Sequence, residues 1–426
     1  MEADTAGPAR TLLILSQVYV PDPASVGQHM HDVAAEMARR GWRVQVLTSA
    51  RGYDDPLRRY PASEQRDGVR IRRFRLSSFG KGSITLRLLG GALFLLQSVV
   101  YALFVPRVRC LLVSTSPPMC SIAGLFLARV KRAPLKFWAM DINPDQLVAL
   151  GKTSPTSLPA RLFDALNRRL LKRAADVVAL DRFMARRLES KVPTRVRMSV
   201  IPPWPHIERV DEILPHSENP FRDRQRLIGK FVVMYSGNLS PSHPIKTILE
   251  AALRLRDEPD LLFLFIGGGL GRREVEQLIE EYEPANVRLL PYQPLSELRA
   301  SLSAADVHLV AMGNQMVGVV HPCKVYGAMA VGRPVLLLGP SPCHVSDILE
   351  RYDVGWQIAH GDVDGAVRRI RELMRSEPGE LERRGHRAQR AVAEQFHRSK
   401  LCGQFCDVLE RGTQAVEDRA TATAAS

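Results

Sequence analysis

The sequence has 426 residues, with 59 Lys and Arg against 45 Asp and Glu, and a formal net charge of +14. This length is too great for one ordinary hydrophobic core, so two globular domains are expected. The basic surplus favours phosphorylated ligands, anionic lipid or nucleic acid as partners. Nucleic acid is the weaker hypothesis, because the sequence has no zinc-finger, RRM or KH signature and no regularly spaced stacking aromatics.

The first ten residues include two acidic residues and no apolar run, so no secretory signal is expected. The six cysteines show neither a CxxC pair nor a zinc-like spacing with histidine. We therefore expect no metal site, no cofactor and a reducing, cytoplasmic location.

The N-terminal half alternates apolar strands with helices. Strands are expected at 12–16, 44–49, 110–115, 135–140, 177–180 and 198–202. An amphipathic helix at about 27–40 joins the first two strands, and Gly41 ends it. Strands that are almost entirely apolar are typical of parallel sheets covered on both faces.

One uncharged segment, LLGGALFLLQSVVYALFV at 88–105, is flanked by arginines. Its length is at the lower limit for a membrane span. A single crossing would separate strands that should share one sheet, so spanning is disfavoured. Two alternatives stay open, a buried core helix and an interfacial helix at a membrane surface. The basic stretches 70–75 and 168–173 slightly favour the surface helix.

A stretch rich in proline and charge, 202–221, predicts a linker. Beyond it the alternation resumes, with strands at 231–237, 261–267, 287–291, 307–312 and 335–339. Two sets of this kind predict an α/β protein of two Rossmann-like, doubly wound domains. The polar tail at 412–426 is expected to be disordered.

Ligands of parallel sheets bind at the carboxyl ends of the strands, so the loops there hold the candidate site. Gly27 begins the first helix and would let backbone N–H groups approach a phosphate or sugar, although an ordinary turn glycine fits better on this observation alone. Asp141 follows a strand and could bind a sugar hydroxyl or act as a base. An Asx-turn explains Asp141 equally well.

The second half offers a set of candidates at its first two strand ends. Gly237 and Asn238 form a tight turn, and His243 precedes the next helix, a combination that can seat an anion. Gly267 and Gly268 follow the next strand.

The glycines at 267 and 268 invite a dinucleotide interpretation, but the G-x-G-x-x-G pattern fails because Arg272 takes the third glycine's place. We expect a close-packed turn there, near a phosphate. Tyr292 follows the third strand and could stack on a nucleobase. Packing of Tyr292 under its own loop is a comparable alternative.

The stretch HPCKVYGAMAVGRPV, 321–335, predicts a helix that begins at about Cys323, just after His321. Lys324 lies in the first turn, where the helix dipole disfavours a cation. The backbone N–H groups of this turn, including that of Val325, lack partners within the helix. A bound diphosphate would satisfy both the N–H groups and Lys324.

In this order and spacing, the quoted blocks resemble the family 4 glycosyltransferases, in particular those that make bacterial surface polysaccharides. The resemblance covers roughly residues 11 to 411 and rests on VGQHMHDVAAEMARRG, WAMDINPD, YSGNLSPSHP, FLFIGGG and PCKVYGAMAVGRPV. It implies the GT-B fold of two facing Rossmann-like domains. The acceptor side would be 1–205, with a crossover helix at about 397–411, and the donor domain would be 206–396.

The resemblance also implies a retaining transfer from a nucleotide-diphosphate sugar, UDP before GDP, to a lipid-linked or polysaccharide acceptor, without an essential metal. The enzyme would work in the cytoplasm, at the inner face of the membrane. Asp141 and Lys324 would be the catalytic residues. The substrate-binding residues would be Gly27, Gly237, Asn238, His243, Gly267, Gly268, Tyr292, His321, Cys323, Lys324 and Val325.

Two departures from the family pattern concern its paired glutamates, whose positions hold Val319 and Gly327. The usual Arg and Lys of the first donor block correspond to Asn238 and His243. A non-catalytic GT-B protein of a polysaccharide complex is therefore the alternative. A Rossmann oxidoreductase is disfavoured by the broken glycine pattern.

Overall fold

The computed structural model describes residues 10–22, 24–52, 57–77, 84–117, 119–207, 212–377 and 379–413. The chain divides into two compact units. Unit 1 combines Met1–Val148, Thr153–Pro202 and Ser399–Ser426, and unit 2 combines Ala149–Lys152 and Pro203–Arg398. Most of the expected tail, 414–426, lies outside the described residues.

Unit 1 is built on an eight-stranded sheet in the order β3-β4-β2-β1-β5-β6-β7-β8. All neighbouring strands are parallel except β3 and β4. The strands are β1 (Thr11–Leu15), β2 (Arg43–Ser49), β3 (Ser63–Arg66), β4 (Val69–Phe74), β5 (Val108–Ser114), β6 (Leu135–Trp138), β7 (Asp176–Ala179) and β8 (Met198–Val200). The helices are α1 (Ser25–Arg39), α2 (Ile84–Leu103), α3 (Cys120–Lys131), α4 (Asp145–Ala149), α5 (Leu158–Arg173), α6 (Arg182–Ser190) and α15 (Arg398–Glu410).

Strands β3 and β4 are absent from the sequence-based prediction, which treated 70–75 as a basic surface stretch. Val69, Ile71 and Arg73 are buried at alternate positions of β4. Arg73 pairs with Glu64 of β3 at 2.6 Å. An arginine at an inward position hides the period-two pattern that marks a strand, and this arginine does not contribute to a basic surface.

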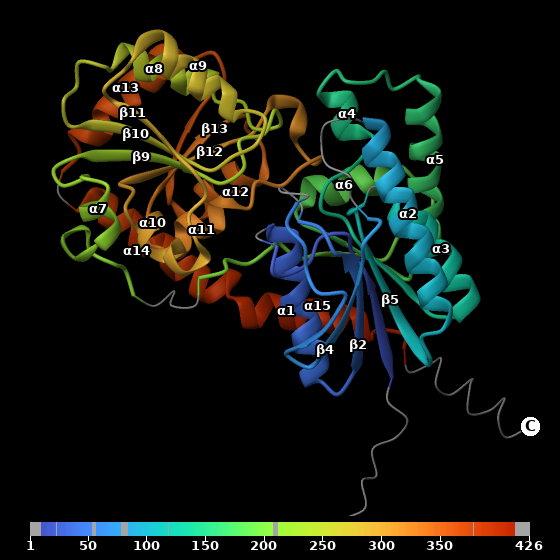
Figure 1. The fold of residues 1–426 in the computed structure, drawn as a ribbon. Coiled ribbons are helices and arrows are strands. Elements are labelled where there is room, and N and C mark those ends of the chain that lie inside the picture. Colours follow the sequence, from blue (N-terminus) through green and yellow to red (C-terminus); the bar gives the residue numbers. More distant parts are fainter. Residues whose placement is uncertain are drawn as a thin grey trace, which may run out of the picture. The chain divides into compact units, whose positions relative to one another are not determined.

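The uncharged segment forms most of α2, which packs beside α3 (Figure 1). Phe94, Ser98 and Ala102 are buried on one side of α2, whereas Leu96 and Val100 are exposed on another. One side of α2 therefore belongs to the core, as in the first alternative, and contact of its exposed side with a membrane surface stays a prediction. Among the described helices, none is long and apolar enough to cross a membrane.

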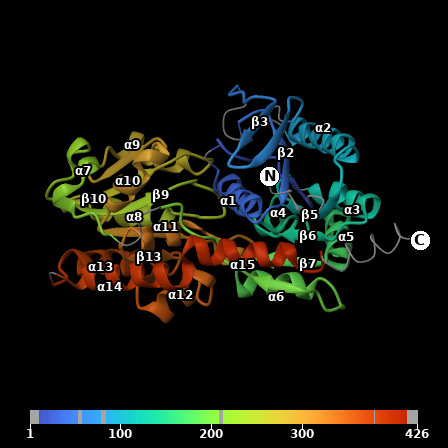
Figure 2. The same cartoon turned by 90° about the horizontal axis from the view of Figure 1, so that it is seen from below.

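The last helix, α15, belongs to unit 1 (Figure 2). Its Phe405 packs against Trp138 of β6, with ring centroids 4.3 Å apart. Beneath it, Lys136 donates to Asp176 at 2.5 Å, with both side chains buried, and to the carbonyl oxygen of Arg411 at 2.7 Å. The crossover helix expected at the C-terminus is therefore present, and it completes the core of the first unit.

Unit 2 is built on a six-stranded parallel sheet in the order β11-β10-β9-β12-β13-β14. The strands are β9 (Phe231–Ser236), β10 (Leu261–Ile266), β11 (Val287–Leu290), β12 (Val307–Ala311), β13 (Val335–Leu338) and β14 (Gly355–Ile358). The helices are α7 (Pro220–Arg224), α8 (Lys246–Arg254), α9 (Arg272–Tyr282), α10 (Leu298–Ser303), α11 (Lys324–Ala330), α12 (His344–Tyr352), α13 (Val363–Met374) and α14 (Glu380–Ala391).

Helices cover both faces of this sheet (Figure 1). Val233 and Phe263 face α8, α9 and α13, whereas Val232 and Leu262 face α7 and the end of α10. Because successive side chains of a strand point to opposite faces, a strand buried on both faces is apolar at every position. The expected fold, two Rossmann-like parallel sheets, is confirmed.

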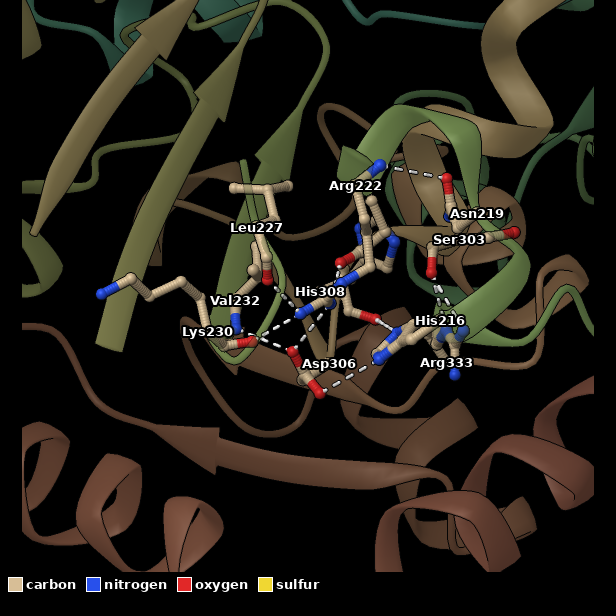
Figure 3. Close-up of polar contacts among 12 residues, drawn as sticks. His216, Asn219, Arg222, Leu227, Lys230, Val232, Ser303, Asp306, His308 and Arg333 are labelled. Carbon is tan, nitrogen blue, oxygen red and sulfur yellow. Dashed lines mark hydrogen bonds and ion pairs between the residues drawn. The ribbon is translucent and has the colours of Figure 1, made fainter. Parts of the chain in front are cut away.

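A buried polar network joins the start of unit 2 to the amino ends of β9 and β12 (Figure 3). Asp306 accepts from the backbone N–H of Val232 at 2.8 Å and from Arg222 at 3.3 Å. Arg222, which is only 4% exposed, also donates to the carbonyl oxygen of Ala304 at 2.7 Å. Arg333 donates to the carbonyl oxygens of Ser303 and Leu214, both at 2.9 Å. The network fixes the amino edge of the sheet, opposite the edge at which ligands bind.

We expect Asp306→Asn to lower the free energy of unfolding by about 3 kcal/mol, because the substitution leaves the buried Arg222 without its countercharge. Urea denaturation would measure the change. The matched control is Asp364→Asn, which removes an 84% exposed partner of Arg254 and should cost at most about 1 kcal/mol. Equal effects of the two substitutions would contradict a structural role for the network.

Candidate active site

The strand order of unit 2 reverses direction between β9 and β12. From β9 the chain moves outward to β10 and β11, and from β12 it moves the other way to β13 and β14. In parallel sheets, ligands bind at the carboxyl ends of the two strands between which the order reverses. The predicted residues of unit 2 lie on the loops at this edge of the sheet and at the start of α11.

The glycines at the ends of β9 and β10 lie against each other. Gly237 donates its N–H to the carbonyl oxygen of Ile266 at 2.8 Å, and Gly267 donates to that of Leu290 at 3.0 Å. A side chain on Gly267 would collide with the carbonyl oxygen of Gly237, and both residues have positive φ. Only glycine fits this approach, so the structure brings the two predicted glycines together.

Asn238 and Tyr292 complete this edge. Leu239 donates its N–H to the carbonyl oxygen of Gly268 at 2.7 Å, which fixes the turn that contains Asn238. The ring of Tyr292 lies 3.0 Å from the position that a Cβ of Gly268 would occupy. Tyr292 remains 47% exposed, so part of its surface is available to a ligand.

Lys324 extends from the start of α11 over Gly237. Its Cε lies 2.8 Å from the position that a Cβ of Gly237 would occupy. Its Nζ lies 5.0 Å from the centroid of the Tyr235 ring. No carboxylate of the described residues pairs with this ammonium. Partial burial lowers the pKa of Lys324 to about 8, because desolvation disfavours the charged form.

The side chains beside Lys324 have contacts of their own. Val325 is fully buried in the core. His321 is also buried, with its Nε2 2.9 Å from the Tyr326 hydroxyl and its ring stacked on His344 at 3.8 Å. Cys323 holds the N-cap position of α11, but its thiol caps no backbone N–H and donates instead to the carbonyl oxygen of His321 at 3.3 Å. Of this segment, the side chain of Lys324 is the one that lies against the β9 loop.

His243 lies on the loop between β9 and α8. Both ring nitrogens are buried and have no hydrogen-bond partner among the described residues. Burial holds the pKa of His243 well below its usual value, and the charge of Lys324 lowers it further. A buried, neutral imidazole with unsatisfied nitrogens suits a bound ligand that supplies an acceptor.

Arg272 explains why the glycine-rich stretch is not a dinucleotide site. Its guanidinium donates to the carbonyl oxygen of Gly267 at 2.9 Å and pairs with Glu276 at 2.6 Å. The side chain therefore fills the approach that the third glycine would leave open in a dinucleotide fold.

Gly27 and Asp141 belong to unit 1. A Cβ on Gly27 would lie 2.9 Å from the Cα of Tyr19, so this glycine allows the loop after β1 to pack on α1. Asp141 is exposed, but the protein atoms around its carboxyl displace part of its hydration and raise its pKa to about 6. It lines a pocket whose walls are mainly apolar, with Phe137, Phe163 and Leu170 among them.

The sequence analysis missed Tyr235 and His344. Tyr235 is the one tyrosine among the apolar residues of β9, and that polar interruption, two residues before Gly237, is the signal that could have identified it. His344 stands at the start of a helix after a short loop, and nothing in its local sequence marks it as a neighbour of His321.

Two parallel-sheet units of the Rossmann type, together with a final helix that returns to the first unit, define the GT-B class of glycosyltransferases. The chain belongs to this class and is a glycosyltransferase of the family 4 type. Residues 25–204 match the family described as "Glycosyl transferase 4-like domain", and residues 218–391 match "Glycosyl transferases group 1".

Two curated relatives carry glycosyltransferase names. The chain is 28% identical over 233 residues to "Probable glycosyltransferase WbjE" of Pseudomonas aeruginosa, and the match covers 55% of this chain but only 58% of that protein. It is 23% identical over 351 residues to "Putative colanic acid biosynthesis glycosyl transferase WcaI" of Escherichia coli K12, covering 80% and 86% of the two chains.

Solved structures agree in fold. Sucrose-phosphate synthase of Thermosynechococcus elongatus superposes with a TM-score of 0.76 at 16% identity, over 95% of this chain and 100% of that one. Anabaena HepE in complex with UDP and glucose gives 0.70 at 16% identity, over 94% and 99%. Likenesses at this level of identity establish the architecture alone.

Proposed function

We propose that unit 2 binds a nucleotide-diphosphate sugar, UDP-linked rather than GDP-linked, and that the enzyme transfers the sugar with retention to a lipid-linked or polysaccharide acceptor. The observation that supports this most directly is the ammonium of Lys324, which lies without a carboxylate partner at the reversal point of the sheet. A buried cation without a countercharge is costly until a ligand supplies one. HepE, whose fold this chain shares, has a crystal structure in complex with UDP and glucose.

The diphosphate would lie between Lys324, His243 and the backbone of the Gly237–Asn238 turn. Lys324 would neutralise negative charge, and His243 would donate a hydrogen bond from its neutral ring. The backbone N–H groups at 323–325 would add donors at the start of α11. Tyr292, exposed beside Gly268, would border the nucleobase.

We assign acceptor binding to unit 1, where Asp141 follows β6 and Gly27 lies in the first turn of α1. In a retaining transfer the leaving diphosphate and the incoming hydroxyl occupy the same face of the sugar. Catalysis then depends on positioning and on stabilising the charge of the leaving group. Lys324 would supply that stabilisation, and Asp141, with its raised pKa, would contact the sugar or the acceptor hydroxyl.

Val319 and Gly327 leave the donor edge without the two glutamates of the family pattern. Val319 is fully buried, and a Cβ on Gly327 would meet only Leu302, at 3.4 Å. Backbone groups and other side chains would therefore carry the sugar and ribose contacts. A thermal-shift assay with UDP, GDP and NAD tests the ligand class, and slow hydrolysis of the donor separates a catalyst from a protein that only binds.

We expect Lys324→Ala to weaken UDP binding by roughly ten- to hundredfold at pH 7, because a charge-assisted hydrogen bond to phosphate is lost. Isothermal titration would measure the change. The melting temperature should not fall, since the substitution removes a cation that the helix start disfavours. The matched control is Lys246→Ala, at the exposed start of α8, which should leave the affinity unchanged.

The same contact predicts a pH dependence. Lys324 has a lowered pKa of about 8, so in the free protein its ammonium is lost as the pH rises through that value, and nucleotide affinity should fall there. Lys324→Arg should keep its charge and remove this decline. A decline that persists in Lys324→Arg would assign the titration to another group.

Retention of the anomeric configuration is a separate expectation, based on the family chemistry. NMR of the first product formed, before mutarotation or further transfer, would show the same anomer as in the donor. An inverted product would rule out the proposed mechanism.

We also propose that unit 1 contacts the membrane surface through α2 and α3. Leu89, Leu96 and Val100 form an exposed stripe on α2, and Ile122 and Phe126 form one on α3. Arg129 and Arg132 are exposed at the end of α3. Apolar side chains beside arginines suit the interface of a bilayer that contains anionic lipid.

Phe104, directly after α2, is 82% exposed and extends this apolar surface. Vesicle sedimentation with phosphatidylglycerol should show binding that falls by about tenfold or more in the variant Leu96→Glu/Phe104→Glu, since each apolar side chain buried in the membrane contributes about 1.5–3 kcal/mol. The control, Ile228→Glu/Leu270→Glu, changes two equally exposed apolar residues of unit 2 and should bind as the wild type does. Wild-type protein that stays in the supernatant would contradict the proposal.

A further inference from the structure

The environment of Lys324 raises a question that the proposed function leaves open. A flexible lysine side chain would normally extend into solvent or pair with a carboxylate. Here the side chain lies over Gly237, and its Nζ faces the Tyr235 ring at 5.0 Å from the centroid. Tyr235 is 1% exposed, in the core below.

We propose that Tyr235 is a positioning residue, whose ring holds the Lys324 ammonium in place and charged at the end of β9 until a diphosphate replaces solvent there. This inference rests on the proposed function for its ligand, but the contact between the two residues does not depend on that ligand.

An aromatic ring is suited to this task because the negative face of its quadrupole attracts a cation without adding a formal charge. A carboxylate at the same place would hold the lysine more strongly, but it would also repel the phosphates and cancel the positive charge that they need. The ring therefore orients the ammonium and leaves the net positive charge of the site intact.

The hydroxyl of Tyr235 adds a second contact. It donates to the carbonyl oxygen of Asn238 at 2.8 Å, so one side chain fixes both the turn after β9 and the lysine that crosses it. Gly237 makes this arrangement possible, since its φ of +125° and its missing Cβ leave the space that the lysine Cε occupies.

Because Tyr235 is buried, a substitution there also disturbs core packing, and the test must separate that effect from the loss of positioning. Phe265 provides the matched control. It is the register partner of Tyr235 on β10, it is equally buried, and the two rings are 6.4 Å apart. Phe265→Leu therefore disturbs the same core as Tyr235→Leu without removing the ring that faces Lys324.

The first measurement uses ligand-free full-length protein with ¹³C-methylated lysines, and follows the Lys324 resonance by NMR as the pH rises. The Lys324 resonance is identified as the one that is missing from the spectrum of Lys324→Arg. Tyr235→Leu should lower the midpoint of this titration, whereas Tyr235→Phe and Phe265→Leu should leave it where it is. A midpoint that is unchanged in Tyr235→Leu, or that moves equally in Phe265→Leu, would overturn the proposal.

The second measurement is UDP affinity at pH 7.5. Tyr235→Leu should weaken binding by about three- to tenfold, in line with the strength of a partly desolvated cation–π contact, and Tyr235→Phe should retain most of it. In the Lys324→Ala background, Tyr235→Leu should have no further effect. A full additive loss in that background would overturn positioning through Lys324. If the wild type binds neither UDP nor GDP, while Tyr235→Leu still lowers the midpoint of the Lys324 titration, the proposed function would be overturned and the positioning role supported.

Discussion

The reversal of strand order between β9 and β12 is the constraint on which the candidate site depends. In parallel sheets, ligands bind above the carboxyl ends of two adjacent strands whose connections lead in opposite directions. The loop after β9 packs on the loop after β10, and glycines at 237 and 267 permit this. Lys324, which enters from the other side of the reversal, meets this packed turn directly. The contacts among Gly237, Gly267 and Lys324 depend on that feature of topology.

At the carboxyl edge of the unit 2 sheet, Lys324 is a cation without a carboxylate partner among the described residues. Acidic residues do occur in unit 2, but Asp306 lies at the amino end of β12, where it balances Arg222. The carboxyl edge instead places an aromatic ring and a neutral histidine around Lys324. The two edges of the sheet therefore differ: the amino edge pairs its buried charges, whereas the carboxyl edge leaves the charge of Lys324 without a carboxylate partner among the described residues, as the proposed anion binding requires.

Much of the fold was predictable from the sequence, because strands buried on both faces are apolar throughout and helices between them end at glycines. β4 escaped prediction because Arg73 points inward and pairs with Glu64, a contact that no local pattern reveals. The glycines and Lys324 of the site were predictable because a steric or electrostatic anomaly marks each of them. The role of Gly27 was less predictable, since only the structure shows that the Tyr19 backbone lies where a Cβ of residue 27 would be. Tyr235 and His344 were missed because the residues that they contact, Lys324 and His321, are distant from them in sequence.

The return of α15 to the first unit has a consequence for synthesis of the protein. Trp138 and the Lys136–Asp176 pair are covered by a helix that ends at Glu410. A ribosome makes about four hundred residues, including all of unit 2, before that helix emerges. Until then, Trp138 and the Lys136–Asp176 ion pair, which are buried in the complete protein, lack the helix that covers them. Unit 2 can therefore complete its fold before α15 has been made, but unit 1 can complete its own only after α15 has emerged.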